Sequence, residues 1–254
     1  MQAELERLRQ ALDLETGRRL ELERQLVRLN GEFEEFISRA AHDVREPLRD
    51  IAAFSQLLAE SCAESGAAGL EANTAEYLAH IRQGAARIES LTSAVVEYWT
   101  PTGDYPLGRA DMEAVLHHAL LVENRKLLAC GATVTQDPLP PVKGNFELLT
   151  KVLRHLLRNA IEYAGPATPT IHISCQRPEP SWVFSVADNG PGIDPSFHER
   201  IFGTFKRLHG RERPGNGLGL AFCRKAIAWH GGRIWVDSQA GAGSTFYFTL
   251  HPVD

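Results

Sequence analysis

Apolar residues in the first hundred positions recur at alternating spacings of three and four, and this repeat constrains the fold more than any other feature of the chain. It predicts one long helix over residues 1–58 and a second helix that starts near Asn73. The small, polar segment 61–73 between them predicts a loop. Pro101 ends the second helix because proline cannot donate the next backbone hydrogen bond. These residues therefore predict a helical hairpin.

The apolar stripe of this hairpin needs a partner. It comprises Leu5, Leu8, Leu12, Leu22, Leu26, Leu29, Phe33, Phe36, Leu48, Ile51, Phe54, Leu57 and Leu58 in the first helix, and Leu78, Ile81, Ala85, Ile88, Leu91, Val95 and Trp99 in the second. A single hairpin exposes the stripe to water, whereas two copies bury it in a four-helix bundle. The sequence therefore predicts a homodimer. Glu15 and Arg19 interrupt the stripe, which fits either a solvated helix or a signalling joint.

From about Leu107 the sequence changes to helical segments, at 111–129 and 145–163, mixed with β-rich segments. The β-rich segments are ATVTQ, TIHISCQ, WVFSVAD, GRIWVDS and STFYFTL. This mixture predicts an α/β sandwich with helices on one face of the sheet, so the fold class is α+β. The predicted domains are a coiled-coil signalling helix (1–32), a helical dimerisation domain (33–101) and a globular domain (107–254), with a linker near 100–107.

Composition excludes several classes of function. The net charge of the 254 residues is -5, so no basic excess points to nucleic acid. No apolar run reaches the roughly 20 residues that cross a bilayer, and the charged N-terminus lacks a signal-peptide core. The four cysteines are scattered and form no C-x-x-C pair, which argues against a zinc or dithiol site. We therefore expect a cytoplasmic protein without a transmembrane segment.

Two glycine-rich turns are candidate ligand sites. The segment DNGPGI at 188–193 follows a predicted strand, which leaves Asp188 at the sheet rim as an acceptor for an exocyclic amine such as that of adenine. The segment GNGLGL at 215–220 precedes a helical pattern, so its backbone N–H groups can approach phosphate oxygens. Taken singly, the first also fits a plain loop. A dinucleotide-binding turn would need a strand directly before the second, and none is predicted.

Two helical segments carry further candidates. His155 and Asn159 are four residues apart and share a helix face, and the Asn159 carbonyl oxygen suits Mg²⁺. His42 points away from the apolar stripe, so its imidazole is available as a nucleophile. Asp43 beside it can orient the ring and accept its proton. Pro47 removes the N–H that would bond the carbonyl of Asp43.

Together and in this order, these segments resemble the sensor histidine kinases of two-component systems over roughly residues 33–250. AHDVREPL around His42 resembles their phosphoacceptor box, and Asn159 matches the magnesium-binding asparagine of their N box. DNGPGI resembles the adenine-binding box, IFGTFKRLH at 201–209 the phenylalanine box of the ATP lid, and GNGLGL the second glycine box. The segments HDVREPL, FKRLH and HGGRIWV are most similar to phytochrome-type kinases.

The resemblance implies a dimerisation and phosphotransfer hairpin followed by a GHKL, or Bergerat-type, ATP-binding sandwich. It implies that His42 and Asp43 are catalytic, that ATP and Mg²⁺ bind under a lid at 194–217, and that the phosphoryl group passes to a response-regulator receiver domain. Nucleotide contacts are implied at Asn159, Tyr163, Asp188, Gly190, Gly192, Ile193, Phe202, Phe205, Arg207, Gly215, Gly217, Leu218 and Gly219, with Mg²⁺ at Asn159.

The chain departs from the pattern of this family at three positions. His155 stands where the N box has asparagine, Glu162 where it has lysine, and Glu46 where many relatives have the threonine or asparagine tied to phosphatase activity. Two alternatives stay open. One is an ATPase similar to the chaperone, gyrase and mismatch-repair proteins, although those carry a glutamate base at the position of His155 and lack a histidine hairpin. The other is a degenerate kinase that serves as a dimeric ATP-binding scaffold.

Overall fold

A computed structural model of the chain describes residues 2–64, 71–99, 105–207 and 215–253. The chain divides into two compact units, residues 1–91 and 92–254. Among the described residues, no helix combines the length and the apolar character needed to span a bilayer.

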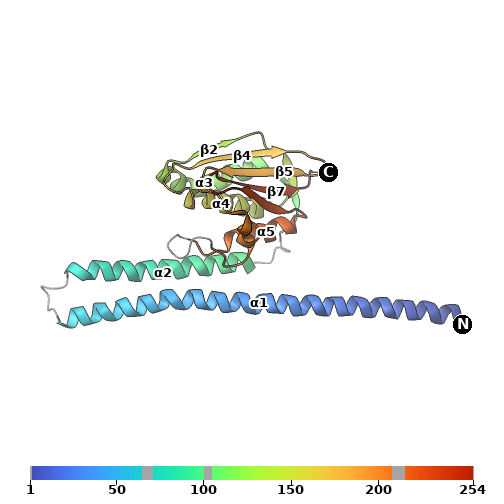
Figure 1. The fold of residues 1–254 in the computed structure, drawn as a ribbon, viewed down its shortest axis with the longest axis horizontal. Helices are drawn as coiled ribbons and strands as arrows, with labels where there is room; N and C mark the ends of the chain where they lie inside the picture. Colours follow the sequence, from blue (N-terminus) through green and yellow to red (C-terminus); the bar gives the residue numbers. More distant parts are fainter. Residues whose placement is uncertain (1, 65–70, 100–104, 208–214, 254) are drawn as a thin grey trace. The chain divides into compact units, whose positions relative to one another are not determined.

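The first unit contains two long helices, α1 (Gln2–Glu64) and most of α2 (Glu71–Trp99) (Figure 1). Helix α1 continues through Pro47, which is buried. The predicted loop at 61–73 was too long at both ends, because its flanking alanines and glutamates favour helix. Residues 65–70 of this loop lie outside the described part of the chain. In α1, the side chains of five predicted seam residues also lie outside it: Leu5, Leu8, Leu12, Leu26 and Leu29.

The two helices of the first unit approach closely at a buried glycine. A Cβ added to Gly84 would lie 2.8 Å from Cγ1 of Ile51 and 3.2 Å from the carbonyl oxygen of Pro47. One turn along α2, Arg87 Nη2 donates a hydrogen bond of 3.0 Å to Oε2 of Glu46. Glycine therefore permits the helix contact, and the ion pair fixes its register.

The second unit contains a five-stranded sheet whose order is β2-β4-β5-β7-β6 among the described residues. β2 pairs in parallel with β4, and the other neighbours are antiparallel. A small antiparallel sheet of β1 and β3 lies beside it. The strands are β1 (Gly108–Asp111), β2 (Thr133–Gln136), β3 (Pro141–Gly144), β4 (Thr170–Gln176), β5 (Trp182–Asp188), β6 (Ile234–Ser238) and β7 (Ser244–Leu250).

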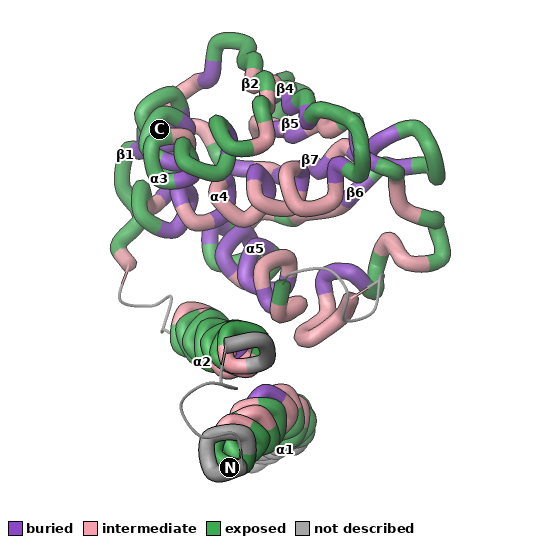
Figure 2. Tube along the Cα trace, turned by 90° about the vertical axis from the view of Figure 1, so that its left-hand side faces the viewer, coloured by how far each residue is buried: buried purple, intermediate pink, exposed green. Residues whose placement is uncertain are grey.

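Three helices lie against one face of the larger sheet (Figures 1 and 2). They are α3 (Met112–Cys130), α4 (Phe146–Glu162) and α5 (Gly219–Trp229). Asp111 caps the N-terminus of α3 and Asn145 that of α4, each accepting hydrogen bonds from free backbone N–H groups. The helix ends are therefore set by local chemistry close to where the sequence predicted them.

Alternating side chains of the central strands form the core of this unit. Phe184 of β5 and Phe246 and Phe248 of β7 are at most 1% exposed and face the helices. Figure 2 shows the buried residues gathered between sheet and helices. The predicted α+β arrangement of the helical region and the one-sided sandwich is confirmed. The strands β1 and β3 were missed, because four-residue strands that contain Gly and Pro carry little propensity.

The last residues of α2 pack with the second unit. Lys225 Nζ of α5 donates a hydrogen bond of 2.6 Å to the carbonyl oxygen of Tyr98, and lies over the rings of Tyr98 and Trp99. Tyr98 packs against the core cluster of this unit. Contacts thus divide the chain before Thr92, ahead of the predicted linker, in which residues 100–104 lie outside the described residues.

Candidate nucleotide site and phosphoacceptor histidine

A pocket lies at the rim of the sheet, between β5, the end of α4 and the segment before α5. It is lined by Asn159, Tyr163, Asp188, Pro191, Gly192, Ile193, Ile201, Lys206, Arg207, Leu220 and Ser244. Six of the residues predicted for nucleotide binding meet here, from three separate parts of the chain. The structure thus brings together the N box, the adenine box and part of the lid.

Asp188 is the partly buried acid of the pocket. It is the last residue of β5, and its Oδ1 accepts a hydrogen bond of 2.8 Å from the Gly190 N–H. Burial raises the pKa of this carboxyl, while hydrogen bonds from the backbone of Gly190 and Ser244 oppose the rise. A donor from a ligand would restore part of the solvation that burial removes. The position therefore suits an exocyclic amine.

The turn after Asp188 requires glycine. Gly192 has a φ of 74°, and a Cβ there would lie 1.9 Å from the carbonyl oxygen of Gln239. The Ile193 N–H donates a hydrogen bond of 2.8 Å to the buried hydroxyl of Ser238. The turn is thus fixed against the loop after β6, which holds the backbone of 191–193 open along the pocket wall.

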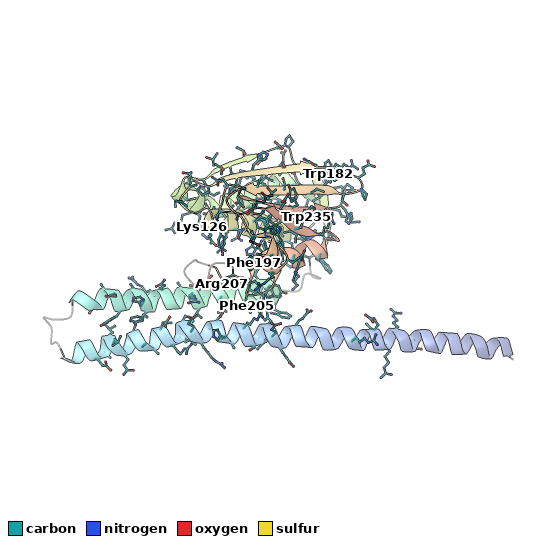
Figure 3. All side chains as sticks on the ribbon, in the orientation of Figure 1. Lys126, Trp182, Phe197, Phe205, Arg207 and Trp235 are labelled. Atoms are coloured by element: carbon teal, nitrogen blue, oxygen red, sulfur yellow. The ribbon has the colours of Figure 1, made fainter. Side chains whose placement is uncertain are left out.

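The segment after the turn carries two short 3-10 helices, η3 (Pro195–Phe197) and η4 (Arg200–Phe202). Phe202 is 3% exposed and packs edge-on against Phe246, so it supports the pocket from the core. Phe205 adopts a positive φ of 56°. Figure 3 marks Phe205 and Arg207 in this segment. Within the predicted lid at 194–217, residues 208–214 lie outside the described residues.

The glycines of GNGLGL hold the lid segment and α5 together. A Cβ on Gly217 would lie 2.8 Å from the carbonyl carbon of Phe205. The side chain of Asn216 accepts a hydrogen bond of 3.1 Å from the Leu218 N–H just before α5. Leu218 is buried, and α5 begins at Gly219. Of this segment, Leu220 lines the pocket and Leu218 and Gly219 do not. Of the predicted contacts, Gly190, Phe202, Phe205, Gly215, Gly217, Leu218 and Gly219 do not line the pocket directly.

Five pocket-lining residues were missed by sequence reasoning: Pro191, Ile201, Lys206, Leu220 and Ser244. Four of them adjoin predicted residues within the same motifs, and that adjacency was an available signal. No such signal was available for Ser244, because only the pairing of β5 with β7 places it opposite Asp188. Strand register, a long-range property, brings it to the site.

His155, one turn before Asn159 on α4, contacts the end of α2. Its Nε2 is 3.1 Å from Oε2 of Glu97, and its side chain is only 15% exposed. Burial alone would raise the pKa of Glu97, but the hydrogen bond and charge of His155, with the charges of Lys151 and Arg154, lower it overall. A Cβ on Gly219 would lie 2.9 Å from His155 Nδ1. His155, which stands where the N box has asparagine, therefore links α2, α4 and α5.

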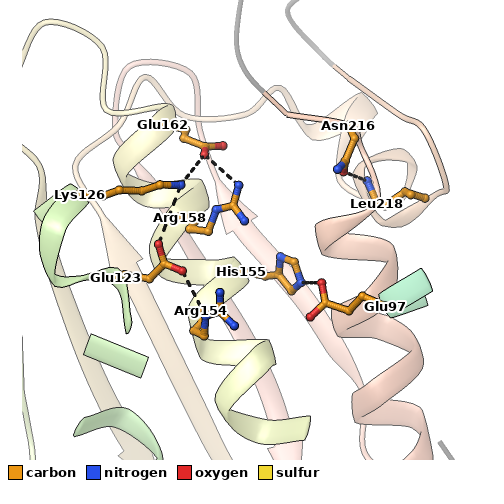
Figure 4. A network of polar contacts seen from close by, with 9 residues as sticks. All are labelled: Glu97, Glu123, Lys126, Arg154, His155, Arg158, Glu162, Asn216 and Leu218. Atoms are coloured by element: carbon orange, nitrogen blue, oxygen red, sulfur yellow. Dashed lines mark hydrogen bonds and ion pairs between the residues drawn. The ribbon is translucent and has the colours of Figure 1, made fainter. Parts of the chain in front are cut away.

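Glu162 belongs to a network of charges on α3 and α4 (Figure 4). Its Oε1 lies 3.4 Å from Nη2 of Arg158 and 3.6 Å from Nζ of Lys126. Lys126 is also 3.9 Å from Glu123, a buried carboxylate that accepts a hydrogen bond of 3.1 Å from Arg154 Nε. Lys126 and Arg158 thus balance the negative charge of Glu162, which stands where the N box has lysine.

The second candidate centre is His42 on α1, in the first unit. Its side chain is 61% exposed, and its Nδ1 lies 3.2 Å from Oδ1 of Asp43. When Nδ1 carries the proton and donates it to this carboxylate, the lone pair of Nε2 is free. Glu46 is one turn further along α1 and is held by Arg87. The residue can therefore act as an exposed, oriented nucleophile.

The residues present fit magnesium and a nucleotide. Magnesium prefers oxygen ligands and is bound in nucleotide sites largely by phosphates and water. Asn159 offers one amide oxygen at the pocket wall. In the described ranges, no group of three or more His, Cys, Asp or Glu side chains gathers to hold a metal by itself. Lys206 and Arg207 supply positive charge at the same pocket.

Comparison with known proteins identifies the relatives of the chain. Residues 144–254 match the family described as histidine kinase-, DNA gyrase B-, and HSP90-like ATPase. Cyanobacterial phytochrome A of Nostoc sp. is 39% identical over 245 residues, which are 96% of this chain and 31% of the relative. Phytochrome-like protein Cph1 of Synechocystis sp. is 36% identical over 245 residues, 96% of this chain and 32% of the relative. The chain thus spans about a third of the length of these curated relatives.

A solved structure supports the fold. Histidine kinase ThkA in complex with the response regulator protein TrrA matches with a TM-score of 0.70 at 22% identity, covering 92% of this chain and 66% of that chain.

Proposed function

We propose that this chain, which belongs to the sensor histidine kinases by its ATPase region and its relatives, transfers the γ-phosphoryl group of ATP to its own His42. The observation that carries the proposal is the exposed imidazole of His42, whose Nδ1 lies 3.2 Å from the carboxylate of Asp43. The second unit of the same chain contains a pocket lined by Asp188. The ATPase fold supports the use of ATP.

The chemistry follows from the oriented imidazole. Nε2 of His42 attacks the γ-phosphorus, an N–P bond forms, and the bond to the oxygen bridging the β- and γ-phosphates breaks to release ADP. The ring becomes cationic in this step, and Asp43 accepts its Nδ1 proton. Since little covalent chemistry is asked of the protein, positioning and charge neutralisation supply most of the rate.

The nucleotide would place its adenine amine on Asp188 and direct its phosphates toward Lys206 and Arg207. Asn159 would hold Mg²⁺, which neutralises charge on the phosphates. The turn at 191–193 and the lid segment would flank the base and the phosphates. The positive end of the pocket thus matches the phosphates of a nucleotide, and its partly buried acid, Asp188, matches the amine edge of a purine.

We further propose that the protein acts as a homodimer and passes its phosphoryl group to an aspartate of a response-regulator receiver domain. The exposed apolar side chains of α1 and α2 support dimerisation, since they need burial against a second copy. A histidine kinase that resembles this chain has been solved with a response regulator, which supports the partner. ATP is abundant in the cytoplasm, where we expect the protein to act.

Autophosphorylation is tested by incubating the full chain with Mg²⁺ and γ-labelled ATP and recording acid-labile, base-stable label. Wild type should label, and His42→Gln should abolish the label because no nucleophile remains. Asp188→Asn should lose label together with ATP affinity.

His80→Gln is a matched control, because this second imidazole of the hairpin stacks on Phe54 and is not the proposed phosphoacceptor. It should keep its label. Label that survives His42→Gln would contradict the assignment. Bound ATP with no label at all would point to the dimeric scaffold instead.

A further inference from the structure

Helix α4 carries two arginines one turn apart, Arg154 and Arg158, and their hydrogen-bond partners differ (Figure 4). Arg154 directs its Nε at the buried Glu123, at 3.1 Å. Arg158 makes a longer contact of 3.4 Å, from Nη2 to Glu162. Its Nε is buried and has no hydrogen-bond partner among the described residues. A buried donor without a partner is costly, so it marks a place where a ligand or solvent is expected to bind.

The neighbours of Arg158 indicate which ligand. Asn159 follows it directly and lines the pocket, and Tyr163 follows Glu162 and lines the same pocket. Arg158 and Glu162 each directly precede a pocket-lining residue of α4 or its C-cap. Gly215, at the end of the lid, lies beside Glu162 and Tyr163, since a Cβ there would be 3.9 Å from Glu162 Oε2 and from the Tyr163 hydroxyl. Arg158 thus contacts, in Glu162, a residue that lies where α4 meets the lid.

Charge also favours an anion at this point. Lys206 and Arg207 line the pocket, and Lys126 lies 3.6 Å from Glu162. A lone carboxylate beside a triphosphate would repel it, whereas here two cations reach the same Oε1 of Glu162. Because Lys126 keeps Glu162 neutralised, Arg158 can turn to a ligand without leaving that acid unpaired. Its side chain is 34% exposed, which leaves room to move.

We propose that Arg158 binds the terminal phosphate of ATP and that Glu162 holds it in place until the nucleotide arrives. This rests on the proposed function and deepens it, because it names the group that distinguishes ATP from ADP. A guanidinium offers five N–H donors in a planar fork that matches phosphate oxygens. Arg158 is therefore the specificity-determining cation of α4, while Arg154 is structural.

The test measures dissociation constants of the full chain for Mg-ATP and Mg-ADP by calorimetry. Arg158→Gln should raise the constant for ATP by about tenfold or more, and that for ADP by less than about twofold. Arg158→Lys should fall between, because it keeps a point charge and loses the fork. Glu162→Gln should tighten ATP binding by up to about fivefold, because it frees the arginine.

Arg154→Gln is the matched control. It makes the same change one turn earlier, and should leave the ratio of ATP to ADP affinity unaltered even if the loss of its hydrogen bond to Glu123 lowers stability. Equal losses for both nucleotides in Arg158→Gln, or a shift in the ratio with Arg154→Gln only, would overturn the proposal. If wild type binds neither nucleotide, the proposed function fails too; if it binds both and Arg158→Gln changes nothing, only the role of Arg158 fails.

Discussion

The helical first unit and the α/β second unit bury their apolar side chains to different extents. In the second unit Phe184 and Phe248 are fully buried by the same chain, between sheet and helices. In the first, Leu48, Leu57 and Leu78 remain 49%, 42% and 43% exposed. The second unit thus encloses a core within this chain, whereas the hairpin leaves part of its apolar stripe exposed. This difference supports the proposed homodimer, in which a second copy would cover the stripe of the hairpin.

The same contrast runs through the chemistry. His42, the proposed nucleophile, is exposed on a helix surface and lies beside the carboxylate of Asp43, its neighbour in sequence. Asp188, the proposed acceptor for the base, is partly buried at the end of a strand, before a turn in which Gly192 leaves no room for a side chain. In the proposed function, the group that meets partner proteins is presented to solvent, and the group that recognises one small molecule lies in a pocket. The first needs two adjacent residues, the second an entire fold.

The largest effect is expected from removing the exposed leucines of the hairpin. Leu48→Gln with Leu57→Gln should convert a dimer to a monomer, with loss of helix signal. Burying each leucine contributes about 1.5 kcal/mol or more. Four leucines in two copies then correspond to about four orders of magnitude in the dimer dissociation constant. Sedimentation equilibrium and circular dichroism measure both, and ATP binding should persist.

The matched control lies in the other unit. Leu121 and Leu128 on α3 are 58% and 74% exposed, so Leu121→Gln with Leu128→Gln makes the same chemical change on the sandwich. It should leave the dimer intact. If this pair dissociates the protein and the hairpin pair does not, the dimer interface lies on the second unit and not on the hairpin.

Much of the fold follows from the sequence because it depends on local patterns. The heptad spacing indicated both long helices, and the strands of the central sheet were found almost to the residue. Errors arose where local signals were weak. The helices extended into the predicted loop at both ends, and β1 and β3 form only because they pair with each other.

The candidate site could be predicted where one motif carries the chemistry, as at Asp188, Gly192 and Asn159. It could not where the residue reaches the pocket through tertiary structure. Ser244 arrives by strand register, and His155 is occupied by Glu97 from a distant helix. No spacing in the sequence reports such contacts, because each depends on how separate elements pack.

A smaller effect, confined to the second unit, is expected from His230. It is 3% exposed, its Nδ1 donates to the Ala226 carbonyl at 2.7 Å, and its Nε2 accepts from the Asn145 N–H at 3.0 Å. Burial lowers the pKa of this histidine below its usual 6.5, against the opposing hydrogen bond to Ala226. The unfolded chain therefore binds the proton first as the pH falls.

Stability from His230 is thus complete above about pH 6.5 and is lost as the pH falls from there through the lower folded-state pKa. The slope is at most about 1.4 kcal/mol per pH unit. His230→Gln should lower the free energy of unfolding at pH 7.5 by about 1–3 kcal/mol and flatten this slope. Urea titrations from pH 5 to 8 measure both. His117→Gln, on the exposed face of α3, should change neither, and a flattened slope in this control would assign the effect elsewhere.

The smallest effect separates two glycines within the helical unit. A Cβ on Gly31 would meet nothing within 4 Å, whereas on Gly84 it would lie 2.8 Å from Ile51. Gly31→Ala should therefore stabilise α1 by about 0.5–1 kcal/mol, because alanine loses less backbone entropy. Gly84→Ala should destabilise the hairpin despite the same gain in propensity, because α1 and α2 must separate. Thermal unfolding at one fixed protein concentration measures both signs. A stabilising Gly84→Ala would mean that the helices do not approach closely there, and would weaken the view that packing, within the hairpin and against its second copy, holds this unit together.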